Sequence, residues 1–242
     1  SFLMAWASLI ANKMRSILTM LGIIIGVAAV IALVSIGNGV KQDIQNSISS
    51  LGSNLLMVMP GAPRTPGVRP SAGSMKSLKV ADYEAIAKLD GVKAASPMTN
   101  GTYVVIYQNK NWTTSVSGVN YNYLDVNNWS MKSGRFLSEK NVLNRERVAV
   151  VGKTVVKNLF GDEDPVGAEI RVKNIPFRII GVLNSKGSGA MGNDQDDMVI
   201  IPYTTAMERV EGVDYLRMIY VVGKDENGID RLQSDIENLL RV

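Results

Sequence analysis

One stretch of the chain ends as a phosphate-binding P-loop does. The run RVAVVGKT closes on the triplet Gly-Lys-Thr at 152–154, and the lysine of such a triplet reaches the phosphates in a true P-loop. The motif G-x-x-x-x-G-K-T also needs an earlier glycine, and Arg147 occupies that position. Without this glycine the loop cannot wrap phosphates with its backbone amides. The sequence therefore predicts a buried strand and a short helix here, and no nucleotide site.

A second stretch combines glycines with carboxylates. Its glycines spell G-x-G-x-x-G at Gly187, Gly189 and Gly192, but a polar patch and a strand follow where a dinucleotide site needs a helix N-terminus. We interpret these glycines as a mobile loop. The carboxylates that follow could hold an ion, contact a partner or simply face solvent: Asp194, Asp196 and Asp197. Solvation is their ordinary role, and a specific partner contact is the functional alternative.

The residue types exclude most catalytic chemistry. The chain has no cysteine and no histidine, which removes disulfides, thiolate nucleophiles, Ser-His-Asp triads and imidazole-bound zinc. The acidic run at 162–164 precedes Pro165 and Gly167, which is typical of a turn. Neither acidic group has the spacing of an EF-hand. We therefore predict no catalytic residue, no cofactor site and no metal site in this chain.

The distribution of charge also argues against a nucleic-acid binder. The formal net charge is +4, and Lys13 and Arg15 are the only charged residues among the first forty. In the rest of the chain, basic and acidic residues nearly balance and are scattered, with an aromatic content of 6% over the chain. Binding to nucleic acid needs clustered basic residues and stacking aromatics. No nucleic-acid partner is expected.

The longest apolar run predicts a membrane-spanning helix. Residues 17–36 read ILTMLGIIIGVAAVIALVSI, twenty residues without a charge, which suits a hydrocarbon layer of about 30 Å. The alternative is a cleaved signal peptide, which has a shorter apolar core. Lys13 and Arg15 precede the run, so the positive-inside rule places the N-terminus in the cytoplasm. Within the run, Gly22 and Gly26 form a small-xxx-small pair that favours close packing of a second helix.

Helical patterns flank this run on both sides. Residues 1–16 predict an elbow helix that lies in the membrane interface or, alternatively, an extension of the span. Residues 37–52 predict a helical stalk that continues outward, and Gly52 supplies its stop. The apolar positions of the stalk recur at helical steps: Val40, Ile44, Ile48 and Leu51.

Residues 53–242 predict an extracytoplasmic core domain of the α+β class. Residues 61–79 are rich in proline and glycine, which predicts a flexible loop. After it, short strands and helices alternate irregularly, which favours a sandwich of small βαβ units over a doubly wound sheet. The predicted pieces include a helix in VADYEAIAKLDG with Ala81, Ala85 and Leu89 near one face, a hairpin turning at 109–111, and a hairpin turning near Asn174.

The order of four stretches resembles the permease subunits of MacB-like ABC transporters, a group that includes FtsX-like and lipoprotein-releasing permeases. The stretches are KMRSILTMLGIIIGVAAVIALVSIGNGVKQDIQNSISSLGSNLLMV, NWTTSVSGVNYNYLDVNNWSMKSGRF, RVAVVGKTVVKNLFGDEDPVGAEIRVKNIPFRIIGVL and QDDMVIIPYTTA. The resemblance extends over the whole chain. It implies a transmembrane helix with a helical stalk, then an extracytoplasmic domain of porter-like βαβ units and a smaller lobe.

The resemblance also implies partners and a mechanism. Such permeases resemble homodimers in the bacterial inner membrane, surrounded by lipid and served by a cytoplasmic ABC ATPase domain that uses ATP and Mg. They work with a membrane-fusion adaptor protein, and they export antibiotics, peptides or other amphiphiles, which links them to antibiotic resistance. Motion is transmitted from the ATPase side to the outer domain. Four transmembrane helices are typical of the family, and this sequence contains one such run.

Two other functions stay open at this point. The first is a non-transport actuator or binding module, such as an FtsX-like regulator of a cell-wall enzyme. The second is an extracytoplasmic enzyme that would use carboxylates and lysines, since these residue types are present. Binding of a hydrolase in place of an adaptor would favour the actuator, and hydrolytic activity of the outer domain would favour the enzyme.

Overall fold

The computed structural model describes residues 13–51, 54–61, 76–189, 192–225 and 228–240, with side chains described except at 15–16 and 40–51. Its first element is the helix α2 (Lys13–Leu51), 39 residues long. Ile17–Gly39 is its apolar part, 23 residues with a mean hydropathy of 2.9. At 1.5 Å per residue this part is about 35 Å long, enough to cross a bilayer. Within the described chain it is the one helix that is long and apolar enough to do so.

The helix α2 continues without a break from the apolar part into the predicted stalk. A Cβ atom placed on Gly22 or Gly26 would meet nothing within 4 Å, so this face is open in the single chain and its packing against another helix stays a prediction. The side chains of the stalk positions, Val40, Ile44, Ile48 and Leu51, lie outside the described set. Most of the predicted elbow helix, 1–16, also lies outside the described residues, as does most of the predicted loop 61–79.

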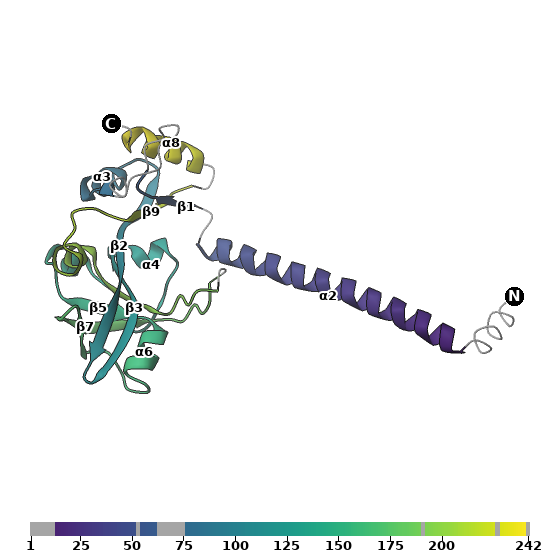
Figure 1. Cartoon of the computed structure of the whole chain (residues 1–242). Coiled ribbons are helices and arrows are strands. Elements are labelled where there is room, and N and C mark those ends of the chain that lie inside the picture. Colours follow the sequence, from purple (N-terminus) through teal and green to yellow (C-terminus); the bar gives the residue numbers. More distant parts are fainter. Residues whose placement is uncertain (1–12, 52–53, 62–75, 190–191, 226–227, 241–242) are drawn as a thin grey trace, which may run out of the picture. The chain divides into compact units, whose positions relative to one another are not determined.

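The remaining described residues build two lobes that share one long strand. The helical lobe contains β1 (Leu55–Val58), α3 (Val80–Ile86), the first part of β2 (Val92–Tyr107), β9 (Met218–Gly223) and α8 (Ile229–Leu240). The strand order is β1-β9-β2, with antiparallel pairing throughout. Figure 1 shows α3 and α8 at this end of the domain. Their buried side chains pack with the strands around Ile86, Ile219 and Leu232, which explains the amphipathic pattern of α8.

The barrel lobe is a closed ring of hydrogen-bonded strands. It contains β3 (Lys110–Val119), β5 (Val148–Val151), β6 (Glu169–Val172), β7 (Ile175–Leu183) and β8 (Met198–Pro202). Around the ring the order is β2-β3-β8-β5-β7-β6, and β6 pairs with β2 at Val105 and Val172 to close it. The short β4 (Met131–Gly134) pairs with the end of β7, at Gly181–Leu183. Figure 1 shows β2 passing from the helical lobe into this ring.

Alternating side chains fill the inside and cover the outside of the ring. On β5, Ala149 and Val151 belong to the inner cluster around Phe177, whereas Val148 and Val150 belong to an outer cluster. This alternation is what strands buried on both faces require. The helix α6 (Lys153–Leu159) and the π-helix η2 (Ala206–Glu211), which follows α7 (Tyr203–Thr205), add to the inner cluster. In the sequence, two short helices follow β3 and precede β5: α4 (Tyr123–Val126) and α5 (Glu139–Leu143).

The α+β class is confirmed, and several local predictions need correction. The strand β2 begins at Val92, although KAASPMTN looks too polar for a strand, because β9 supplies it with hydrogen-bond partners. The first hairpin turns at Gln108 and Asn109, since Tyr107 pairs with Lys110. The helix α3 ends at Ile86, which is its buried residue, while Ala81 is exposed. The hairpin predicted near Asn174 is confirmed.

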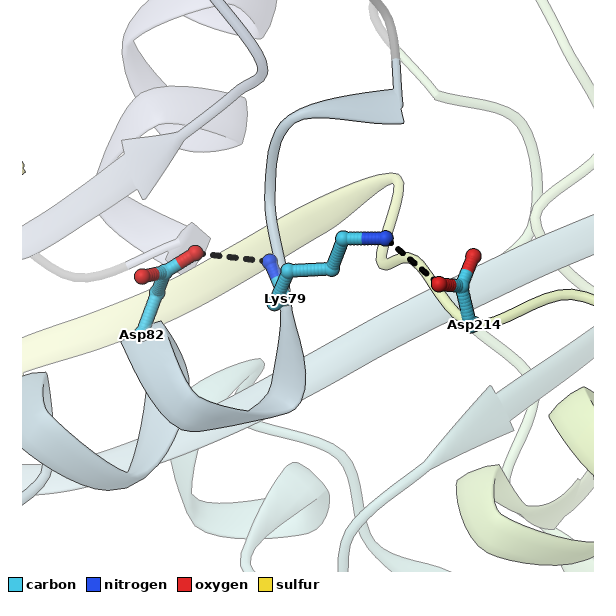
Figure 2. Close-up of polar contacts among 3 residues, drawn as sticks. All are labelled: Lys79, Asp82 and Asp214. Carbon is cyan, nitrogen blue, oxygen red and sulfur yellow. Dashed lines mark hydrogen bonds and ion pairs between the residues drawn. The ribbon is translucent and has the colours of Figure 1, made fainter.

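The segment leading into α3 is tied to the helical lobe. Leu78 is buried, and its carbonyl accepts a hydrogen bond from the Leu216 amide at 2.7 Å. The Lys79 amide donates to the Asp82 carboxylate at 2.7 Å, and the Lys79 ammonium lies 2.7 Å from the Asp214 carboxylate (Figure 2). The prediction of a flexible loop over 61–79 is therefore wrong for residues 78 and 79, because the buried Leu78 side chain and the cap of α3 hold them in place.

Candidate functional site

The stretch with glycines and carboxylates forms a hairpin between β7 and β8, which we call the Asp196 hairpin (residues 184–197). Its described arms are cross-linked by backbone hydrogen bonds, from the Gly189 amide to the Asn193 carbonyl at 2.8 Å and from the Gln195 amide to the Gly187 carbonyl at 3.1 Å. Ser188 and Asp194 form an antiparallel bridge between the arms. The hairpin is thus a defined excursion from the barrel lobe.

Asp196 is the centre of this hairpin. Its side chain is buried, with 4% of the residue exposed. One carboxylate oxygen accepts from the Lys186 amide at 2.8 Å, and the other accepts from the Gly187 amide at 3.2 Å and from the Ser185 hydroxyl. Hydrogen bonds to a buried charge are among the strong ones. The Asp196 carboxylate, which was expected to face solvent, is therefore buried and joins the two arms of the hairpin by hydrogen bonds.

The three glycines serve the shape of the hairpin. Gly187 and Gly192 have φ angles of +74° and +77°, in the left-handed region that glycine tolerates best. A Cβ on Gly189 would come within 2.7 Å of the Asn193 Oδ1 atom. Backbone shape thus accounts for the G-x-G-x-x-G pattern without a phosphate.

The P-loop-like triplet lies against the root of the same hairpin. The Gly152 amide donates to the Met198 carbonyl at 2.9 Å and the Thr154 amide to the Asp196 carbonyl at 3.2 Å. The Thr154 hydroxyl donates to Asp194 at 2.6 Å. A Cβ on Gly152 would lie 2.1 Å from the Asp196 carbonyl oxygen. Two of the amides that a phosphate would need are already bonded within the domain, and Gly152 is required for close packing.

The two arms are also attached to the surrounding barrel lobe. The Trp112 indole donates to Asp197 at 2.8 Å. The Lys186 ammonium donates to the Asn127 carbonyl at 2.6 Å and lies 4.6 Å from the centre of the Trp129 ring, a distance suited to a cation–π contact. Burial lowers the pKa of Lys186 below its ordinary value. Trp112, Thr154 and Lys186 thus each tie the hairpin root to the rest of the domain.

This arrangement can present a shaped surface. Among the described residues, no group of three or more acidic side chains could hold a metal ion. All three carboxylates accept hydrogen bonds within the domain, and Asp194 is the one that is exposed. The partner contact predicted for the three carboxylates stays a prediction. Sequence reasoning missed the structural role of Asp196, because its donors, Ser185, Lys186 and Gly187, are 9 to 11 residues away along the chain.

Replacing Asp196 with alanine is expected to loosen the hairpin. The change removes the acceptor of two backbone amides and one hydroxyl, at a cost of about 2–3 kcal/mol. Hydrogen exchange of the Lys186 and Gly187 amides should accelerate. Asp162→Ala, at an exposed carboxylate in a turn of the same lobe, is the control and should leave these rates unchanged. Equal protection in both variants would contradict the role assigned to Asp196.

Comparison with known proteins identifies the relatives of this domain. The family model described as MacB-like periplasmic core domain matches residues 16–239. This chain belongs to the MacB-like periplasmic core domain family. A "Macrolide export ATP-binding/permease protein MacB" of Rhodospirillum rubrum is 44% identical over 240 residues, and one of Chlorobium luteolum is 38% identical over 237. Each alignment covers 98% of this chain and 36% of the relative, so the chain spans about a third of the length of these relatives.

Two solved structures of ABC-transporter domains share the fold. The periplasmic region of MacB from Actinobacillus actinomycetemcomitans superposes with a TM-score of 0.67 at 24% identity, covering 80% of this chain and 86% of that one. The extracellular domain of the noncanonic ABC-type transporter YknZ from Gram-positive bacteria gives a TM-score of 0.64 at 19% identity, covering 77% and 92%. The predicted family is confirmed, and these two likenesses establish the fold of the outer domain.

Proposed function

We propose that this chain is the first transmembrane helix and the outer domain of a MacB-type exporter, in which cytoplasmic ATP hydrolysis drives motion of the outer domain. The observation that carries the proposal is the family match over residues 16–239, which includes the apolar helix as well as the domain. Relatives that align over 98% of this chain bear the name of macrolide export ATP-binding/permease proteins. A macrolide or a similar amphiphile is therefore the proposed cargo.

The length of α2 supports mechanical coupling. Its 39 residues extend over about 58 Å, of which a hydrocarbon layer takes about 30 Å. The part beyond Gly39 continues as helix to Leu51, four residues before β1 begins at Leu55. With Lys13 and Arg15 on the cytoplasmic side, this part projects outward. A helix without a break can pass a displacement along its axis, which a flexible linker cannot.

The proposed partners follow from the same comparison. They are a cytoplasmic ABC ATPase domain with its ATP and Mg, a second copy of the chain in the inner membrane, and a membrane-fusion adaptor outside. The exposed Asp194 arm of the Asp196 hairpin is the part of the domain that we propose for contact with a partner, because Thr154 fixes its geometry. Gly22 and Gly26 are proposed to pack against another membrane helix.

Transport by the full-length protein tests the proposal. In inverted membrane vesicles that also contain the adaptor, a labelled macrolide should accumulate when ATP is added and should not accumulate with a non-hydrolysable analogue. Vesicles without the full-length protein provide the baseline. Absence of ATP-dependent accumulation, together with binding of the outer domain to a cell-wall hydrolase, would overturn export in favour of the actuator.

A further inference from the structure

The described chain passes between the two lobes at two places. The first is within β2, where Met98 pairs with Met218 of β9 and also with Val119 of β3. The second is the segment 212–217, which leads from the π-helix η2 of the barrel lobe to β9 of the helical lobe. Any change in the angle between the lobes must therefore bend β2 near Met98 and rotate the segment 212–217.

One carboxylate, that of Glu211, contacts both of these places. The Thr99 hydroxyl, one residue beyond Met98, donates to Glu211 Oε1 at 2.5 Å. The Arg217 guanidinium, at the far end of the second crossing, lies 3.8 Å from Glu211 Oε2. The Arg217 amide also donates to the Met98 carbonyl at 3.0 Å. The two crossings are thus joined to each other through Glu211 and Arg217.

Burial makes this carboxylate depend on its partners. The Glu211 side chain is 4% exposed, and Thr99 is fully buried. A buried carboxylate that loses its hydrogen bonds is costly, because water cannot replace them. Glu208, on the same π-helix, makes an ion pair with Arg145 in which both side chains are more than half exposed, and such surface pairs contribute little. Of the two, only Glu211 penalises a change in the angle between the lobes.

The barrel lobe holds Glu211 in position. Lys173, in the turn between β6 and β7, donates to the Val210 carbonyl at 3.0 Å, and Val210 is buried in the inner cluster. Directly after Glu211, Gly212 has a φ angle of +67° and ends the π-helix. The carboxylate therefore moves with the barrel lobe, while the chain beyond it can turn.

We propose that Glu211 is a latch that holds the two lobes at a fixed angle, and that the lobes pivot about Met98 and the segment 212–217 when it is released. The ion pair between Lys79 and Asp214 lies on the same segment (Figure 2), but its side chains are 44% and 85% exposed. Because both side chains are largely in solvent, this ion pair contributes little. Apolar side chains also join the lobes, since Tyr203 of α7 and Met207 of η2 are buried in the cluster of the helical lobe. To this packing the buried Glu211 carboxylate adds the polar contact that is lost when the angle changes.

Paired spin labels on the two lobes test the latch. The chain contains no cysteine, so Lys88→Cys in the helical lobe and Lys157→Cys in the barrel lobe, both exposed, provide the only labelling sites in the 242-residue chain. In the otherwise unchanged chain, we expect a single narrow distance distribution. Glu211→Ala should broaden it, and Thr99→Val, which removes the hydroxyl and keeps the shape, should broaden it in the same direction.

Two controls separate release of the latch from loss of folding. Glu208→Ala removes a charge from the same π-helix and should leave the distribution narrow. A second label pair within the barrel lobe, at the exposed Glu169 of β6 and Lys157 of α6, should report an unchanged distance in every variant. If Glu211→Ala also changes the distance within the second label pair, the variant has disturbed the fold of the barrel lobe. The distribution measured for Thr99→Val then tests the latch. A narrow distribution in Thr99→Val and Glu211→Ala, or equal broadening in Glu208→Ala, would overturn the proposal.

Discussion

Gly152→Val is expected to destabilise the outer domain by about 3 kcal/mol, at the upper end of what overpacking costs. A Cβ at this position would lie 2.1 Å from the Asp196 carbonyl oxygen and 2.9 Å from its carbonyl carbon. Backbone atoms cannot move aside as the end of a flexible side chain can. Either the root of the Asp196 hairpin or α6 must therefore shift, and α6 contributes Val155 and Leu159 to the inner core. The midpoint of urea unfolding, followed by circular dichroism, measures the effect.

Gly61 provides the matched control for this substitution. A Cβ at Gly61 would meet nothing within 4 Å, so Gly61→Val should change the free energy of unfolding by less than about 0.5 kcal/mol. If the two valine variants unfolded at the same urea concentration, close packing would not explain Gly152. The result also bears on the P-loop likeness, because a phosphate-binding glycine would affect ligand binding and leave the stability of the free protein unchanged.

The sequence predicts best the elements whose conformation is decided by the residues within the element itself. The run at 17–36 is uniformly apolar, and only a helix satisfies its backbone in lipid. RVAVVG is buried on both faces as β5, and Lys173 and Asn174 both have positive φ angles in the turn where the β6–β7 hairpin was expected. Local chemistry is decisive in these segments.

The elements that depend on distant partners could not be predicted. KAASPMTN becomes a strand because β9, more than a hundred residues later, pairs with it. Closure of the ring rests on two residue pairs between β2 and β6, for which no local pattern exists. The same holds for the polar groups. Asp196 and Glu211 look like surface carboxylates in sequence, and their burial follows from donors brought together by the fold.

Inserting three glycines after Ile44 is expected to abolish export by the full-length protein while its ATP hydrolysis continues. The insertion lies in the part of α2 beyond the apolar span. Each glycine disfavours helix by about 1 kcal/mol relative to alanine, so the insertion converts a rigid connection into a flexible one. ATP-dependent macrolide accumulation and phosphate release, measured in the same vesicles, show whether the two activities separate.

A helical insertion at the same place is the control. Seven residues of alanine and glutamate lengthen the stalk by about 10 Å but return the helix to nearly the same face, and we expect export to be retained in part. Export that survives the glycine insertion at the normal rate would contradict coupling through the helix. Loss of ATP hydrolysis as well would show that the glycine insertion prevents assembly. The export rate of the helical insertion then tests coupling through the helix.

Movement of the outer domains during the ATP cycle is the most direct test of the central claim. A single label at Lys157→Cys in the full-length protein reports the distance between the outer domains of the two copies in the proposed dimer. We predict that this distance changes when the ATPase is trapped with ATP and vanadate, and that the change disappears with the glycine insertion after Ile44. An unchanged distance in an exporter that hydrolyses ATP and transports cargo, or a change that survives the insertion, would contradict the claim that α2 transmits motion.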